Sequence, residues 1–217
     1  MKQTHFWNKK FLLAGLFCLF ISFSSWAQTN PLILVLGDSL SAEYGLSRES
    51  GWVNLLEQQL LQDRSPWLVF NSSISGETSS GGLSRLPSLL EQKRPGIIII
   101  ELGANDALRG LPLSETESNL RNMIVKGKKS GAKVLLLGLQ IPPNYGQKYT
   151  AQFKALYPTL AREENIQLLP FFLEGIATRP ELFQADRIHP NEQAQSILFK
   201  NVWGSMAPYR DTLKRAP

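Results

Sequence analysis

The stretch IIIIEL at residues 97–102 is rich in β-branched residues and apolar on both faces. Such a run predicts a strand buried on both sides, which is typical of a parallel sheet covered by helices. Four further runs of strand length accompany it, at residues 32–36, 67–70, 133–138 and 166–169. The five runs together predict a five-stranded parallel sheet.

Helical patterns separate these runs. They cover about residues 52–61, 82–92 despite Pro87, 114–130 with Gly131 as a stop, 149–165, and 191–203. Strands that alternate with helices predict an α/β fold, a doubly wound, flavodoxin-like sheet with helices on both faces in three layers. We expect the strand order 2-1-3-4-5, with the ligand beyond the carboxyl ends of the strands.

The amino-terminal segment has the pattern of a secretory signal peptide. Three lysines precede an apolar run at residues 11–23, which is shorter than the roughly 20 residues that cross a bilayer. Ser25 and Ala27 supply a small-x-small exit, so we expect cleavage after Ala27 and a periplasmic or secreted protein. The alternatives are an uncleaved anchor and a lipid on Cys18, which the bulky Phe17 before it disfavours.

Loss of residues 1–27 would lower the net charge from +5 to +2, with 20 basic and 18 acidic residues remaining. This balance gives no reason to expect nucleic acid or stable membrane insertion. The single cysteine would leave with the segment, which excludes a disulfide, and His189 would be the remaining histidine. Residues 28–217 contain no repeat or linker, so we expect one domain, which we take to be a monomer.

Polar residues follow the predicted strands. Ser39 comes directly after the first run, and we expect it on a tight turn at a helix N-terminus, where backbone N–H groups favour negative charge. Gly76 follows the second run, and Asn105 follows the third behind the small residues Gly103 and Ala104. Taken singly, an N-cap serine and a loop glycine are the more common explanations of Ser39 and Gly76, and an Asn-Asp turn explains Asn105 as well as a functional side chain does.

A base is supplied near the C-terminus. A serine hydroxyl needs a neighbouring base to become a nucleophile, and histidine is the usual one. His189 lies in a loop after the fifth run, and Asp186, three residues earlier, can hold the other ring nitrogen. A lone histidine is more often structural, but here a nucleophile, a base, an acid and two oxyanion donors each follow a predicted strand. This is the set of roles for acyl transfer.

The ordered blocks GDSL at 37–40, Gly76, GAND at 103–106 and DRIHP at 186–190 resemble those of the GDSL, or SGNH, hydrolase family. Within the family, the chain is most similar to a bacterial group of multifunctional acyl-CoA thioesterases, proteases and lysophospholipases. The resemblance covers nearly all of residues 28–217.

The resemblance implies Ser39 as nucleophile, His189 as base and Asp186 as its partner. It also implies an oxyanion hole made by Ser39, Gly76 and Asn105. It predicts a serine esterase or thioesterase acting on small-molecule acyl esters, such as lysophospholipids, aryl esters and acyl-CoA, without cofactor or metal. The alternatives are a carbohydrate O-deacetylase of the same fold and a secreted binding module with a dead site.

Two positions depart from the pattern of the family. Glu43 and Ala104 stand where this group commonly has glycine, and we hypothesise that the charge of Glu43 disfavours anionic substrates. We also hypothesise that Ala104 stiffens the loop 103–110. Apolar residues that could line an acyl groove, or alternatively pack in the core, are Leu108, Leu111, Ile141, Tyr145, Phe171 and Phe172.

Overall fold

A five-stranded parallel sheet forms the middle layer of the protein. The computed structural model describes residues 31–215, and the strand order is β2-β1-β3-β4-β5, which confirms the predicted order. The strands are β1 (Leu32–Gly37), β2 (Leu68–Asn71), β3 (Ile97–Glu101), β4 (Lys133–Leu137) and β5 (Gln167–Leu169).

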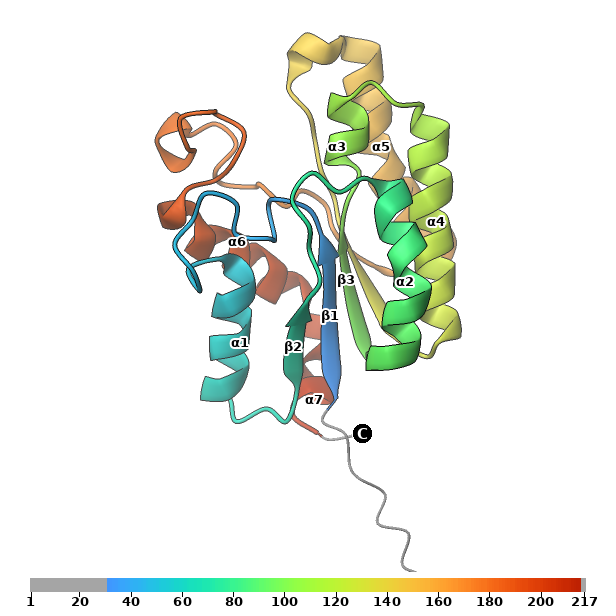
Figure 1. Cartoon of the computed structure of the whole chain (residues 1–217), viewed down its shortest axis with the longest axis vertical. Coiled ribbons are helices and arrows are strands. Elements are labelled where there is room, and N and C mark those ends of the chain that lie inside the picture. The colour runs from blue at the N-terminus through green and yellow to red at the C-terminus, as the bar shows by residue number, and fades with distance from the viewer. Residues whose placement is uncertain (1–30, 216–217) are drawn as a thin grey trace, which may run out of the picture.

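Helices cover both faces of this sheet (Figure 1). The helices α1 and α6 pack together on one face, and α2, α4 and α5 pack on the other. Their bounds are α1 (Trp52–Gln62), α2 (Ser79–Lys93), α4 (Leu113–Lys129), α5 (Gln147–Glu164) and α6 (Glu192–Ser205). The three layers and the helix on each predicted segment are therefore confirmed.

Short helical segments in the connections between the main elements and after α6 were not predicted from the sequence. They are α3 (Ala104–Leu108), α7 (Arg210–Leu213), and the 3₁₀ turns Pro143–Tyr145, Pro180–Leu182 and Ala207–Tyr209. Each spans five residues or fewer, which is too short to show a helical period in the sequence. The helix α2 begins three residues earlier than expected, because Thr78 caps it by accepting a hydrogen bond from the N–H of Gly81.

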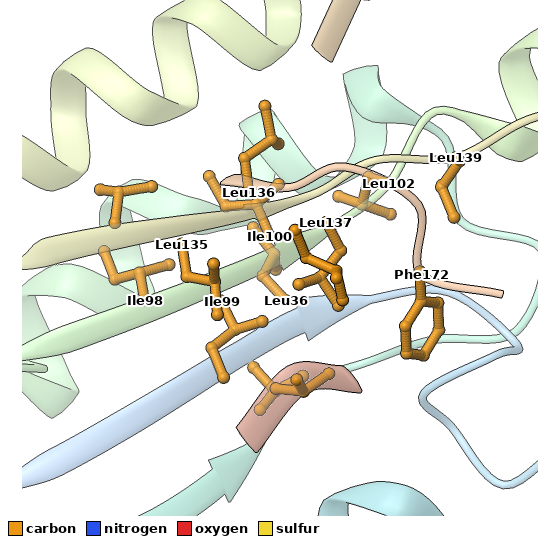
Figure 2. Close-up of a cluster of buried hydrophobic side chains, with 14 of the residues drawn as sticks. Leu36, Ile98, Ile99, Ile100, Leu102, Leu135, Leu136, Leu137, Leu139 and Phe172 are labelled. Atoms are coloured by element: carbon orange, nitrogen blue, oxygen red, sulfur yellow. The ribbon is translucent and has the colours of Figure 1, made fainter. Parts of the chain in front are cut away.

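The core lies along the central strands. The four isoleucines of β3 are fully buried, as are residues 33–36 of β1 and 135–137 of β4, and Figure 2 shows how Ile98, Ile99 and Ile100 pack among them. Phe172 is also fully buried and meets the ring of Trp52 edge-on, with centroids 5.6 Å apart. Of the residues weighed for an acyl groove, Phe172 therefore belongs to the core.

The expected signal peptide, residues 1–27, lies outside the described residues, and so does its cleavage site. In the part of the chain that is described, no helix combines the length and the apolar character needed to span a membrane.

Candidate active site

Ser39 lies on a turn directly after β1, at the carboxyl edge of the sheet. The carbonyl oxygen of Asp38 accepts hydrogen bonds from the N–H of Ser41 (3.2 Å) and of Ala42 (2.9 Å). The expected helix directly after Ser39 is absent, since α1 begins only at Trp52. The backbone of Glu43 has φ = 57°, and a residue in this left-handed region ends any right-handed helical path.

The fold brings together the side chains of Ser39, His189 and Asp186, the three residues singled out in the sequence, in one line of hydrogen bonds. His189 Nε2 lies 2.9 Å from Ser39 Oγ, and His189 Nδ1 lies 2.7 Å from Asp186 Oδ2. When Asp186 is ionised, Nδ1 of His189 carries the ring proton and donates a hydrogen bond to the carboxylate. Nε2 is then unprotonated and can accept a hydrogen bond from the serine hydroxyl. This is the tautomer that a general base needs.

The acid of the triad is held by its own loop. Partial burial works against ionisation of Asp186, but hydrogen bonds from the backbone and ring of His189, and from the N–H of Ile188, outweigh it and lower the pKa of Asp186 to about 2. The loop closes on itself, because the N–H of Gln184 donates to the carbonyl of His189 at 2.8 Å. Tyr44 is the aromatic neighbour across the site, with its ring centroid 4.4 Å from that of His189.

Two of the expected oxyanion donors are free. Within residues 31–215, the backbone N–H groups of Ser39 and Gly76 donate to no protein acceptor. Gly76 has φ = 79°, a conformation that glycine adopts without strain. Its loop is clamped, because Arg85 donates to the carboxylate of Glu77 (2.8 Å) and to the hydroxyl of Ser72 (2.9 Å).

Asn105 lies in the first turn of α3, and its side chain is engaged. Its Nδ2 donates to Asp38 Oδ2 at 2.9 Å and to the carbonyl of Glu77 at 3.0 Å, so both amide hydrogens have partners. An oxyanion at this position would have to share or replace one of these bonds. The sequence predicted that Asn105 follows β3, but not that it ties β3 to the turn of Ser39 and to the loop of Gly76.

Two buried carboxyl groups beside Ser39 were not identified from the sequence. Glu101, the last residue of β3, is fully buried, and its Oε2 accepts from the N–H of Asp38 (3.2 Å) and from Ser41 Oγ (2.8 Å). Asp38 is 1% exposed, and burial raises its pKa to about 6. In the sequence IIIIEL, Glu101 is the one charged residue of an otherwise apolar strand, and this could have indicated a buried carboxyl group with a specific role.

A third buried acid, Asp106, joins three helices on the other side of the site. Its carboxylate accepts from the N–H of Ser79 at 2.8 Å and from the Ser79 hydroxyl, and Thr116 donates to it at 3.4 Å. These contacts tie the start of α2 to α3 and α4. They stabilise the loop that carries Gly76, which ends where α2 begins.

The two departures from the family pattern differ in surroundings. The carboxylate of Glu43 accepts from the N–H of Gly51 (2.8 Å) and of Glu49 (3.1 Å), so its charge is used within the loop before α1. Ala104 begins α3, after Gly103, which has φ = 115°. A Cβ at Gly103 would lie 2.7 Å from the hydroxyl of Tyr157, so glycine is needed at 103 for space as well as for conformation.

Within residues 31–215, no three acidic, histidine or cysteine side chains are grouped so that they could hold a metal ion. At the carboxyl edge of the sheet, the described residues place a hydroxyl, an imidazole and a carboxylate in line, beside free backbone N–H groups.

Comparison with known proteins gives consistent results. Residues 35–197 match the model of the GDSL-like lipase/acylhydrolase family. The chain is 45% identical to the esterase TesA of Pseudomonas aeruginosa, over 91% of this chain and 97% of that protein. It is 42% identical to thioesterase 1/protease 1/lysophospholipase L1 of Escherichia coli, over 86% and 87%. The psychrotrophic esterase EstA from Pseudoalteromonas sp., solved inhibited by monoethylphosphonate, superposes with a TM-score of 0.79 at 41% identity, over 84% of this chain and all of that chain.

Proposed function

The chain belongs to the GDSL-like lipase/acylhydrolase family and is a carboxylic ester hydrolase, and we propose that it cleaves acyl esters and thioesters through an acyl-enzyme on Ser39. The observation that carries this proposal is the unbroken line of hydrogen bonds from Ser39 through His189 to Asp186. The serine and the histidine come from opposite ends of the domain, and the fold brings them within hydrogen-bonding distance.

In the proposed first step, Nε2 of His189 removes the proton of Ser39 Oγ while Oγ attacks the acyl carbonyl carbon. The imidazolium that forms is stabilised by Asp186, which stays ionised because its pKa is about 2. His189 then protonates the leaving alcohol or thiol, and the acyl group remains on Ser39. Water, activated by His189, releases the carboxylic acid and restores the serine.

The negative charge of the tetrahedral intermediate needs donors that are already in place. The N–H groups of Ser39 and Gly76 are free to donate and belong to a turn and a loop that are held by other contacts. Asn105 would supply a third donor by exchanging its bond to Asp38 or to the carbonyl of Glu77 for one to the oxyanion. Donors fixed before the reaction are the largest source of stabilisation in such sites.

The surroundings of the site favour an acyl chain as the group transferred. Within residues 31–215, seven large apolar side chains are exposed, and five of them lie between the carboxyl end of a strand and the next long helix, namely Tyr44, Ile74, Leu111, Tyr145 and Ile188. Exposed apolar residues gathered around a nucleophile are suited to bind a hydrocarbon chain. We therefore propose small-molecule esters and thioesters of medium to long acyl chains, including lysophospholipids, aryl esters and acyl-CoA.

The proposal extends to the amino-terminal segment, the number of domains and the location of the protein. We propose that residues 1–27 are a signal peptide removed after Ala27, and that residues 28–217 act as a single, monomeric domain in the periplasm or outside the cell. The mass of the exported protein tests the first point. A mass that includes residues 1–27 would contradict it.

Labelling with a fluorophosphonate probe tests the nucleophile. We expect one label on the wild-type protein, mapped to Ser39 by peptide mass analysis, and none on Ser39→Ala, while thermal melting shows that the variant folds. Labelling of a different residue, or none on the wild type, contradicts the proposal.

A series of p-nitrophenyl esters from acetyl to palmitoyl then tests which acyl group the enzyme prefers. Activity on acetyl alone would instead identify a deacetylase.

A further inference from the structure

The carboxyl group of Glu101 is buried beside the nucleophile but takes no part in the proposed steps. Its side chain has no exposed surface, and β3 places it next to Gly37, the last residue of β1. A Cβ at Gly37 would lie 2.8 Å from Glu101 Oε2, so the glycine leaves the space that this carboxyl group fills. Burial of a carboxyl group costs free energy unless its contacts offset that cost, so the contacts of Glu101 indicate its role.

The contacts of Glu101 lead to both sides of Ser39. Its Oε2 accepts from the N–H of Asp38 and from the hydroxyl of Ser41, which are the residue before the nucleophile and the second residue after it. Asp38 in turn accepts from the N–H of Leu40 at 3.0 Å and from Asn105 at 2.9 Å. Glu101 thereby holds the turn of Ser39 and, through Asp38, the amide of Asn105.

The charge of the pair must be small for it to be buried. The carboxyl groups of Glu101 and Asp38 belong to neighbouring residues, since Glu101 Oε2 accepts from the N–H of Asp38, and two negative charges in one buried site disfavour ionisation of both groups. Within residues 31–215, no lysine or arginine pairs with either group. Among the other titratable groups, His189 lowers the pKa of Asp38, while the charges of both carboxyl groups raise the pKa of the buried Tyr157 of α5.

The arrangement of donors identifies which carboxyl group holds the proton. Asp38 accepts two N–H bonds, one at each oxygen, which favours its ionised form. Glu101 receives its bonds at Oε2, and its Oε1 has no partner among the described residues, so Oε1 is free to carry a proton. Burial and the charge of Asp38 both raise the pKa of Glu101 well above its usual value.

We propose that Glu101 is a positioning residue that remains uncharged at neutral pH and, by accepting hydrogen bonds from the N–H of Asp38 and the hydroxyl of Ser41, fixes the turn of Ser39 and, through Asp38, the amide of Asn105. This inference rests on the proposed function, because it assigns Glu101 a part in placing that nucleophile. A neutral carboxylic acid is a hydrogen-bond donor as well as an acceptor, and a buried site can keep it so at neutral pH.

Two substitutions separate the hydrogen-bonding role from mere filling of space. Glu101→Gln is uncharged and keeps an acceptor for the N–H of Asp38 and the hydroxyl of Ser41, so we expect kcat on p-nitrophenyl butyrate within about threefold of wild type. Glu101→Leu keeps the volume but has no acceptor, and we expect kcat to fall about tenfold or more with KM within about twofold. Equal losses in the two variants would overturn the proposal that an uncharged acceptor at residue 101 fixes the turn of Ser39.

The matched control is Tyr157→Phe. Tyr157 is equally buried near the end of β3 and donates to the carbonyl of Leu102 at 3.1 Å, but bonds neither Asp38 nor the turn of Ser39. We expect it to lower the melting temperature and to leave kcat within about twofold. If Glu101→Leu lowers kcat no more than Tyr157→Phe does, Glu101 has no positioning role.

Infrared spectroscopy of the wild type tests the proton without relying on activity or on folding of the leucine variant. We expect the C=O stretching band of a protonated carboxylic acid at neutral pH in the wild type and its loss in Glu101→Gln. Absence of the band from the wild type would overturn the proposal. Fluorophosphonate labelling of the same wild-type sample reports separately on the proposed function, so the two failures are distinguishable.

Discussion

The two halves of the proposed catalytic triad are held in place by different means. The turn of Ser39 depends on distant parts of the chain, because Glu101, more than sixty residues away, bonds to residues on both sides of the serine and is fully buried. His189 depends on its own loop, since its partner Asp186 is three residues away and that side chain is 38% exposed.

This difference means that the nucleophile is positioned by the sheet, and the base by a short closed loop. Substitutions that remove hydrogen bonds on the nucleophile side should therefore lower both activity and stability, because those hydrogen bonds also join strands to neighbouring loops. Substitutions on the base side should lower activity alone. Four variants can test that contrast, and the one with the largest effect comes first.

Asp186→Asn should produce the largest loss among these variants. An amide favours the wrong imidazole tautomer and does not stabilise the imidazolium, so we expect kcat to fall roughly 10³- to 10⁴-fold. The melting temperature should stay close to that of the wild type, because the side chain is exposed and its contacts are local. A large fall in melting temperature, measured by circular dichroism, would remove the contrast between the two sides.

Asn105→Ala should lower both quantities. We expect kcat to fall roughly 10²- to 10³-fold from loss of an oxyanion donor. Loss of the bonds to Asp38 and to the carbonyl of Glu77 should also lower the unfolding free energy by about 1–3 kcal/mol. The control is Asn122→Ala on the exposed face of α4, with neither effect expected. Unchanged stability in Asn105→Ala would count against the proposed link between the site and the sheet.

Glu101→Gln should change the pH dependence of stability. The pKa of Glu101 is raised in the folded protein, so the folded state retains a proton that the unfolded chain has released, and stability falls as pH rises above about 4.5, by up to about 1.4 kcal/mol per pH unit. Glutamine does not titrate. The difference in unfolding free energy between variant and wild type should therefore grow in favour of the variant from pH 5 to pH 7.

Urea denaturation at the two pH values measures this difference. Glu91→Gln on the surface of α2 is the control and should show no such trend. A difference that does not change with pH would mean that Glu101 is ionised in the folded protein over this range.

Glu43→Gly should have the smallest effect. The carboxylate is occupied by the N–H groups of Glu49 and Gly51, and glycine adopts the left-handed conformation at 43 more easily than glutamate does. We expect the ratio of acyl-CoA to p-nitrophenyl ester kcat/KM to change by less than about twofold. A selective gain on acyl-CoA would show instead that the charge of Glu43 repels anionic substrates, as the sequence suggested.

Much of the fold could be predicted because it depends on local patterns. The five strands are apolar runs, and polar residues follow the ends of several of them, so the order of Ser39, Gly76, Asn105 and His189 along the chain already indicated one edge of a sheet. The helices could be predicted from their period, but α3 could not, because five residues are too few to display one.

The contacts that support the triad were beyond prediction from one sequence. That Glu101 lies beside Asp38 depends on the register of β1 and β3, which aligns Gly37 with Glu101. That Asn105 bonds to Asp38 and to Glu77 depends on three loops meeting in space. Such long-range contacts leave no periodic trace in the sequence. A charged residue in a buried strand is the signal that could have drawn attention to Glu101.

The two ends of the described chain meet at the edge of the sheet opposite the triad. The carbonyl of Pro31 accepts from the N–H of Leu68, and the carbonyl of Arg215 accepts from the indole of Trp67, the preceding residue. Chain ends this close can be joined, and new ends opened in an exposed turn such as that at Gly131. A circular permutant made in this way should hydrolyse p-nitrophenyl esters, so the enzyme could be inserted whole into a loop of another protein.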